Sequence, residues 1–255
     1  MNDKIWTPPT SKSARIHAMR SYPELEYRTL ERIPVQRPVE RVAFIANLCR
    51  DKNVLDIGCL DETAVKKQGT DDWLHRRIAR VANTVLGVDS SSTLPDGGLV
   101  TGPNARIVKG DGLSPNLSAD EERAVEVIVA GEFIEHLENP LAFIRAMKAK
   151  FTGRLLILST PNGVAFANAL LGTVGREAQH PDHLLTSTFK TLNMLCKRAE
   201  CSSWEIIPYR FYATEMLLDS KGVKRLAIKL VQSAIRAIEW MFPLRSFGYV
   251  VHITL

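Results

Sequence analysis

Short apolar runs alternate along the chain with longer stretches of helical periodicity. Seven runs rich in strand-forming residues lie at 53–57, 84–88, 105–108, 125–129, 154–159, 204–212 and 248–255. Other stretches, at 39–49, 71–83, 141–150 and 186–200, place apolar residues at the spacing of one helix face. This alternation predicts an α/β fold built on a mostly parallel sheet.

The first apolar run ends in a sharp polar turn. Asp56 lies at its end, and Gly58 follows, where a residue without a side chain lets the backbone pass close to a ligand. Open α/β sheets bind ligands in the crevice at the carboxyl ends of their strands. A dinucleotide-binding turn would need further glycines, but Cys59, Leu60 and Asp61 stand there. The turn therefore predicts either a cofactor site without a pyrophosphate or an ordinary buried strand and turn.

Two further strands end in acids. Asp89, followed by Ser90, ends the second run, where a carboxylate can accept hydrogen bonds from both hydroxyls of a ribose. Asp111 lies between Gly110 and Gly112 after the third run. Each acid alone could serve only as a turn or cap residue. Three acids in register at one sheet edge favour an adenosine-containing cofactor.

The segment 124–140, AVEVIVAGEFIEHLENP, is the most informative part of the sequence. Its first half is a buried strand, Gly131 lets the chain leave that strand, and Pro140 marks the start of a helix. Between them lies one helical turn with Glu132, Glu135 and His136 at positions i, i+3 and i+4. This spacing predicts that the three side chains point from one face toward the cofactor.

These segments together resemble class I S-adenosylmethionine-dependent methyltransferases, in the group that includes ubiquinone-pathway catechol O-methyltransferases and small-RNA 3′-terminal ribose 2′-O-methyltransferases. The resemblance covers about residues 53–201 and rests on the DIG turn at 56–58, AGEFIEHLENP at 130–140, LSTPNG at 158–163 and HPDHLLTSTFKTL at 180–192. It implies a Rossmann-like, doubly wound sheet of seven strands in three α/β/α layers, with the last strand antiparallel beside the sixth.

The resemblance also implies site residues. We expect S-adenosylmethionine to contact Asp56, Gly58, Cys59, Asp89, Ser90, Gly110, Asp111, Gly112 and Gly131, with Asp111 accepting a hydrogen bond from the adenine amino group. In the RNA enzymes a Glu-x-x-Glu-His cluster and a later histidine hold a divalent metal on the acceptor diol. Carried over by position, the ligands are Glu132, Glu135, His136 and His183. Two carboxylates and two imidazoles suit Mg²⁺, Mn²⁺ or Fe²⁺.

A role without metal is open for the same residues. His136 can act as the general base that takes the proton of an acceptor hydroxyl, with Glu135 fixing its tautomer. Among the late histidines, His183 is preferred to His180 because it follows an acid that can orient it.

The predicted reaction is methyl transfer to a hydroxyl of a small-molecule, glycan or lipid-linked acceptor. Nucleic acid is disfavoured as the acceptor, because Leu184, Leu185 and Thr186 follow His183 where the RNA enzymes carry aromatic and acidic residues. Two alternatives are a cofactor-binding module without catalysis and an RNA ribose 2′-O-methyltransferase.

Composition and charge limit which partners and which cellular location are expected for the protein. The chain has 255 residues and a net charge of +5, with the excess of basic residues at both ends and a slightly acidic middle, which argues against a nucleic-acid surface over the whole protein. A polar start and the lack of any run of about 18 apolar residues predict a cytoplasmic protein. The four cysteines have no zinc-site spacing and are expected to be reduced.

We expect one methyltransferase domain at 39–255, preceded by a proline-rich arm at 1–38. A helical insertion at about 215–247 separates the last two strands. Its segment 221–242 has a broad apolar face opposite Lys221, Arg225, Lys229 and Arg236. An apolar face of this width is expected to pack against another surface. The candidates are the sheet edge, a second subunit in a homodimer, an apolar substrate, or peripheral contact with an anionic membrane.

Overall fold

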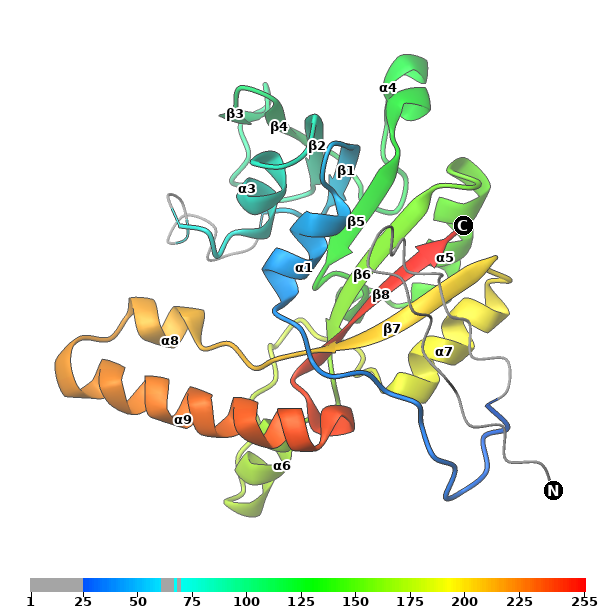
Figure 1. Ribbon diagram of the computed structural model, residues 1–255. Coiled ribbons are helices and arrows are strands. Elements are labelled where there is room, and N and C mark those ends of the chain that lie inside the picture. The colour runs from blue at the N-terminus through cyan, green and yellow to red at the C-terminus, as the bar shows by residue number, and fades with distance from the viewer. Residues whose placement is uncertain (1–24, 61–66, 68–69) are drawn as a thin grey trace, which may run out of the picture.

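An eight-stranded sheet forms the centre of the computed structural model, which describes residues 25–60, 67 and 70–255 (Figure 1). The strand order is β3-β4-β2-β1-β5-β6-β8-β7. The strands are β1 (Asn53–Ile57), β2 (Thr84–Asp89), β3 (Leu99–Gly102), β4 (Ala105–Lys109), β5 (Val127–Gly131), β6 (Leu155–Pro161), β7 (Ser203–Tyr209) and β8 (Gly248–Thr254). The five strands from β4 to β6 in this order pair in parallel, whereas β8 runs antiparallel to both β6 and β7.

The sheet has one strand more than the predicted seven. The additional strand is β3, which pairs antiparallel with β4 at the edge of the sheet. It has four residues with a glycine at its end, too short a run to distinguish from a loop by its apolar pattern. The α/β class and the reversed last strand beside the sixth predicted strand are confirmed.

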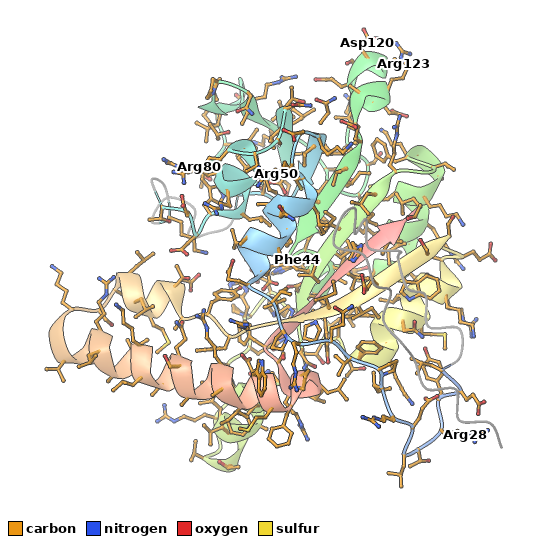
Figure 2. The ribbon with its side chains drawn as sticks, viewed as in Figure 1. Arg28, Phe44, Arg50, Arg80, Asp120 and Arg123 are labelled. Atoms are coloured by element: carbon orange, nitrogen blue, oxygen red, sulfur yellow. The ribbon has the colours of Figure 1, made fainter. Side chains whose placement is uncertain are left out.

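Helices cover both faces of the sheet and give the predicted three layers (Figure 1). One hydrophobic core joins the sheet to α1 (Arg41–Leu48) and α3 (Leu74–Ala79), and the other joins it to α5 (Pro140–Lys150) and α7 (Phe189–Arg198). On the first face, Phe44 of α1 places its ring 6.3 Å from the imidazole of His252 on β8 (Figure 2). The short helix α4 (Ala119–Ala124) projects from the body and carries an ion pair between Asp120 and Arg123 (Figure 2).

Local sequence explains where the helices begin. The Asn139 side chain accepts a hydrogen bond from the Ala142 N–H at 3.0 Å, and Pro140 occupies the first turn of α5, as predicted. Helix α3 starts later than the predicted 71–83. Trp73 lies at its N-cap and donates its indole N–H to the carbonyl of Cys59 at 2.9 Å, so this ring fastens the turn after β1.

The segment between β7 and β8, where an insertion is predicted at about 215–247, is helical. It contains α8 (Thr214–Leu218), α9 (Gly222–Met241) and the 3₁₀ turn η2 (Pro243–Arg245). Helix α9 extends beyond the sheet, with α8 on one side and α6 (Phe166–Thr173) on the other (Figure 1). In the part of the chain that the structure describes, no helix is long and apolar enough to span a membrane.

The part of the predicted arm that the structure describes packs against α7. Leu25 is buried, and the Tyr27 hydroxyl donates to the carbonyl of Lys190 and accepts from the Asn193 side chain. Residues 1–24 of that arm, and residues 61–66 and 68–69 of the loop after β1, lie outside the described residues.

Candidate active site

The carboxyl ends of β1, β2 and β5 open into a cavity of about 690 Å³. Six of the nine predicted cofactor residues line it, namely Asp56, Gly58, Cys59, Asp89, Ser90 and Gly131. The cavity does not reach Gly110, Asp111 and Gly112, and Asp111 accepts a hydrogen bond from the Leu113 N–H at 2.9 Å. Contact between the cofactor and these three residues stays a prediction.

Asp56 is held by a buried histidine that is not among the predicted site residues. Its Oδ2 lies 2.9 Å from Nδ1 of the fully buried His75, whose Nε2 lies 2.9 Å from the Thr101 hydroxyl. A carboxylate only accepts, so Nδ1 carries the proton that it donates to Asp56. The pair fixes the end of β1 through buried hydrogen bonds.

The turn after Asp56 requires glycine for two reasons. Gly58 has a φ of +65°, in the left-handed region, and a Cβ at this position would lie 2.6 Å from Cδ2 of Phe133. The backbone at Gly58 therefore packs directly against the side chain of Phe133, which follows β5.

Asp89 is nearly buried and is oriented by two backbone amides. Its Oδ2 accepts from the Leu60 N–H and its Oδ1 from the Ser91 N–H, both at 2.8 Å. Each carboxylate oxygen can accept a second hydrogen bond. Asp89 therefore joins the turn after β1 to the end of β2 and keeps capacity to bind a ligand in the cavity.

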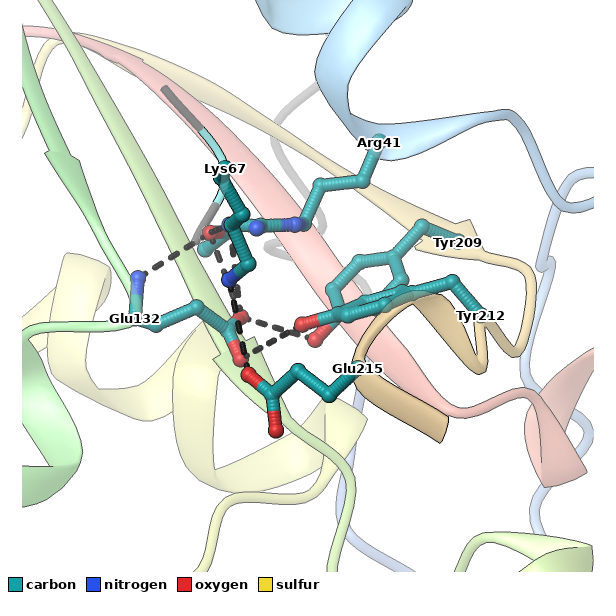
Figure 3. Close-up of polar contacts among 7 residues, drawn as sticks. Arg41, Lys67, Glu132, Tyr209, Tyr212 and Glu215 are labelled. Atoms are coloured by element: carbon teal, nitrogen blue, oxygen red, sulfur yellow. Dashed lines mark hydrogen bonds and ion pairs between the residues drawn. The ribbon is translucent and has the colours of Figure 1, made fainter. Parts of the chain in front are cut away.

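Glu132 leaves β5 in a strained conformation, with a φ of +55°. Its Oε1 accepts a hydrogen bond from the Tyr209 hydroxyl at 2.8 Å, and its Oε2 accepts one from the Tyr212 hydroxyl at 3.3 Å (Figure 3). The guanidinium of Arg41 lies 3.7 Å from Oε1. Burial raises the pKa of both tyrosines, and Glu132 adds to this effect, so both hydroxyls stay protonated and donate to the carboxylate.

Two cationic side chains that line this side of the cavity were not predicted from the sequence. Arg41, at the start of α1, is buried, and its Nη1 donates to the Ser159 hydroxyl at 3.1 Å. Lys67 is nearly buried and forms an ion pair with Glu215 of α8 at 3.4 Å (Figure 3). Neither residue belongs to a motif, and the fold brings them together from segments far apart in the chain.

The predicted face shared by Glu132, Glu135 and His136 is not formed. The turn is a short 3₁₀ helix that begins at Ile134, and Glu132 precedes it with left-handed backbone geometry, so helical spacing does not apply. The Glu135 carboxyl is buried instead, and its oxygens have no hydrogen-bond partner within the described chain. Burial, and next the carboxylate of Glu132, raises the pKa of Glu135 to about 9, so this carboxyl holds a proton at neutral pH.

Three imidazoles converge at the edge of the cavity. The ring nitrogens that His136, His180 and His183 can offer to an ion lie within 4.8 Å of one another. His136 Nδ1 lies 3.2 Å from the carbonyl of Asp182 and donates to it, so this carbonyl, rather than Glu135, fixes the tautomer of His136. His180, which was ranked below His183 from the sequence, belongs to the group. Burial, with the two neighbouring imidazoles, lowers the pKa of His183, which favours the neutral form that binds metals.

This group fits the predicted metal only in part. The close set of candidate ligands contains His136 and His183 but neither Glu132 nor Glu135. Magnesium and manganese prefer oxygen ligands, whereas imidazoles alone suit zinc, iron or nickel. The four-residue ligand set stays a prediction.

The comparisons with known proteins agree with this architecture. A methyltransferase-domain family model matches residues 27–205, and no match was found among curated protein sequences. The small RNA methyltransferase HEN1 has a TM-score of 0.55 at 16% identity, over 88% of this chain and 27% of that one. The [4+2]-cyclase SpnF has a TM-score of 0.50 at 17% identity, over 84% and 80% of the two chains. A putative methyltransferase from an antibiotic biosynthesis pathway of Anabaena variabilis has a TM-score of 0.50 at 14% identity, over 84% and 96%.

The fold and the strand-end cavity define a class I, Rossmann-like protein of the methyltransferase type. Because the family model covers most of the chain, the protein belongs to the methyltransferase-domain family, and it is an S-adenosylmethionine-dependent methyltransferase. The structural neighbours show the fold alone. One is named as a cyclase and another as an RNA methyltransferase, so the acceptor must be argued from this protein's own site.

Proposed function

We propose that the protein transfers the methyl group of S-adenosylmethionine to a hydroxyl of a small-molecule, glycan or lipid-linked acceptor. The observation that carries this proposal is the imidazole group of His136, His180 and His183, which lines the same cavity as Asp56 and Asp89. A hydroxyl must lose its proton as it is methylated, and an imidazole group beside the cofactor can take that proton.

The cavity suits the cofactor in size and in chemistry. Its volume of about 690 Å³ lies within the range of small-molecule sites. Asp89 has free acceptor capacity for the ribose hydroxyls, and Gly58 and Gly131 expose backbone beside it. A Cβ at Gly131 would lie 2.7 Å from Leu74, which shows how closely the chain is packed there. S-adenosylmethionine supplies an electrophilic methyl group bonded to a sulfonium.

The far side of the cavity suits a polar acceptor. Arg41, Lys67, Tyr212 and Glu215 line it together with Glu132. Such groups bind and orient hydroxyls through hydrogen bonds. Because positioning alone can supply much of the rate of a displacement, this polar wall is expected to fix the acceptor oxygen in line with the methyl group.

His136 is the group best placed to act on the proton. Its Nδ1–H is engaged by the Asp182 carbonyl, which leaves Nε2 as an acceptor. A metal on the three imidazoles is the second route, in which the ion lowers the pKa of the acceptor hydroxyl. The two routes differ in their response to chelators.

The test is transfer of labelled methyl groups from S-adenosylmethionine to separate pools of glycans, lipid-linked saccharides, catechol-type small molecules and RNA with a free 3′ end. We expect label in one of the first three pools, in a product that resists mild base because it is a methyl ether. Label released by base would identify a methyl ester. Transfer to RNA alone would support the ribose 2′-O-methyltransferase alternative and contradict the proposal.

A further inference from the structure

Helix α9 contacts the domain along one side, and α8 and α6 flank it (Figure 1). It has 20 residues and is about 30 Å long, and of these only Ile228, Ile235 and Glu239 are buried. Glu239 accepts a hydrogen bond from the Phe211 N–H at 2.8 Å, and Gln232 accepts one from the Ala213 N–H at 2.8 Å. These contacts fix which side of the helix faces the protein.

The opposite side is apolar along the whole helix. At 3.6 residues per turn, Val223, Leu226, Leu230 and Met241 point away from Ile228 and Ile235. Each of these four residues is exposed over more than half of its surface. Alanines at 227, 234 and 237 fill the space between them. We call this surface the outer face of α9. An apolar strip of this length on a folded protein marks a binding surface.

The charges beside the outer face are all positive. Lys224 and Lys229 lie on its two sides, whereas Lys221 and Arg225 lie on the side that faces the domain, where Arg225 lines a small cavity. The single acid in α9 is Glu239, which is buried in the contact with the domain. The exposed part of the helix therefore combines an apolar strip with cations and contains no acid.

The combination of an apolar strip with cations distinguishes between two possible partners for the outer face, a second copy of the chain and a lipid membrane. Packing of two copies through α9 would place lysines of one helix beside lysines of the other without an acid from either helix to pair with them. An anionic bilayer provides both an apolar region for the strip and negative headgroups for the lysines. We infer that α9 lies along the surface of an anionic lipid membrane, with its outer face inserted between the headgroups.

Docking through α9 would hold the domain close to the lipid surface. A second cavity of about 230 Å³ is lined by Arg225, Gln232 and Arg236 of α9. It shares Arg41 and Lys67 with the large cavity. The membrane contact does not depend on the proposed function, since it can be measured without an acceptor.

The test is sedimentation of the full chain with vesicles of phosphatidylcholine alone or mixed with phosphatidylserine. We expect binding to the mixed vesicles that weakens with salt, and little binding to phosphatidylcholine alone. The double variant Val223→Glu/Leu230→Glu should lose roughly tenfold or more in partitioning, because two apolar side chains no longer enter the bilayer. Lys224→Ala and Lys229→Ala should each cost about fivefold on anionic vesicles.

The matched control is Leu30→Glu/Val100→Glu. It adds the same charge at two exposed apolar residues outside α9, and it should bind vesicles as the wild type does after correction for net charge. Circular dichroism melts of both double variants check folding. Absence of wild-type binding to anionic vesicles at low salt would overturn the inference, and so would equal losses in the two double variants. A wild-type dimer that Val223→Glu/Leu230→Glu dissociates would assign the outer face to a second copy.

Discussion

The two halves of the large cavity are built differently. In the cofactor half, Asp56 and Asp89 end neighbouring strands, and each carboxylate has fixed partners within hydrogen-bond distance. In the acceptor half, Glu132 adopts left-handed backbone geometry, the carboxyl of Glu135 is buried without a partner among the described residues, and imidazoles gather at the rim. Strain and unpaired buried groups cost stability and tend to be retained where chemistry occurs.

The difference shows how each half is assembled. The cofactor half comes from consecutive β–α units, so its residues lie close together in sequence. The acceptor half combines α1, the end of β5, the 180–183 loop and the segment after β7. We infer that the cofactor half is a rigid support and that the acceptor half carries the specificity. Variants in the two halves should therefore separate cofactor binding from turnover.

The largest effect is expected in the acceptor half. His136→Ala removes the imidazole best placed to accept a proton, and turnover should fall by about 10²-fold or more. Cofactor affinity, measured by calorimetry, should change less than about twofold, because the strand-end acids are untouched. A parallel loss of cofactor binding would show that the two halves are not separable.

A chelator then distinguishes the two chemical roles of the same imidazoles. If His136 acts as a base, exhaustive dialysis against chelator leaves turnover intact. If the imidazoles hold an ion, chelator abolishes turnover, added metal restores it, and His183→Ala behaves like His136→Ala. The geometry favours the base, so we expect activity to survive chelation.

The next largest effect is expected in the cofactor half. Asp89→Ala should weaken S-adenosylmethionine binding by about 1–3 kcal/mol, because ribose hydrogen bonds are lost and the Leu60 and Ser91 amides lose their acceptor. Asp111→Ala is the matched variant, since Asp111 also follows a strand but lies outside the cavity. Calorimetry should show the smaller loss for Asp111→Ala. Equal losses would place the adenine beside Asp111, as the family resemblance implies.

The fold and the cofactor half were largely predictable from sequence. Apolar runs that end in acids or glycines identified six residues that line the cavity, because the carboxyl ends of parallel strands meet at one edge. The edge strand β3 was missed, since four residues carry too little periodicity. The partner of Asp56 was also missed, because His75 lies in a helical segment and nothing in the local pattern shows that it points toward β1.

The acceptor half was less predictable, and the reason is backbone geometry. The i, i+3, i+4 spacing of Glu132, Glu135 and His136 assumed a helix, but a positive φ at Glu132 turns its side chain toward Tyr209 and Tyr212. Arg41 enters the site from a helix that precedes the first strand. Such long-range contacts leave no local trace in a single sequence.

A pH-dependent effect is expected where α9 supports the acceptor half. Burial raises the pKa of Glu239 from its ordinary value of 4.5 to about 7. Its contribution to stability is therefore complete below about pH 4.5 and is lost as the pH rises through about 7. Glu239→Gln does not titrate, so the free energy of unfolding of wild type relative to this variant should fall by about 2 kcal/mol between pH 4.5 and 8. Denaturant titrations at the two pH values measure this change, and the exposed Glu138→Gln serves as the control. If the difference in unfolding free energy between wild type and Glu239→Gln were the same at both pH values, the raised pKa of Glu239 would be contradicted.

The smallest expected effect is that of Tyr212→Phe, which tests whether the tyrosines beside Glu132 contribute to catalysis or only to packing. Tyr212→Phe removes a hydrogen bond of 3.3 Å to the Glu132 carboxylate. The carboxylate keeps the shorter bond from Tyr209. We therefore expect a loss of about 1 kcal/mol, which corresponds to roughly a fivefold lower kcat.

Tyr249→Phe is the matched control for Tyr212→Phe. Tyr249 is buried, and its hydroxyl donates a bond of 3.3 Å to the carbonyl of Leu244, away from the cavity. Both variants should lose similar stability in denaturant titrations, because each removes one long hydrogen bond. Of the two variants, only Tyr212→Phe should lower kcat. Tyr212 holds the Glu132 carboxylate that borders the acceptor, and Tyr249 does not. Equal kcat values for the two variants would assign Tyr212 to packing and leave Tyr209 and Arg41 to hold Glu132.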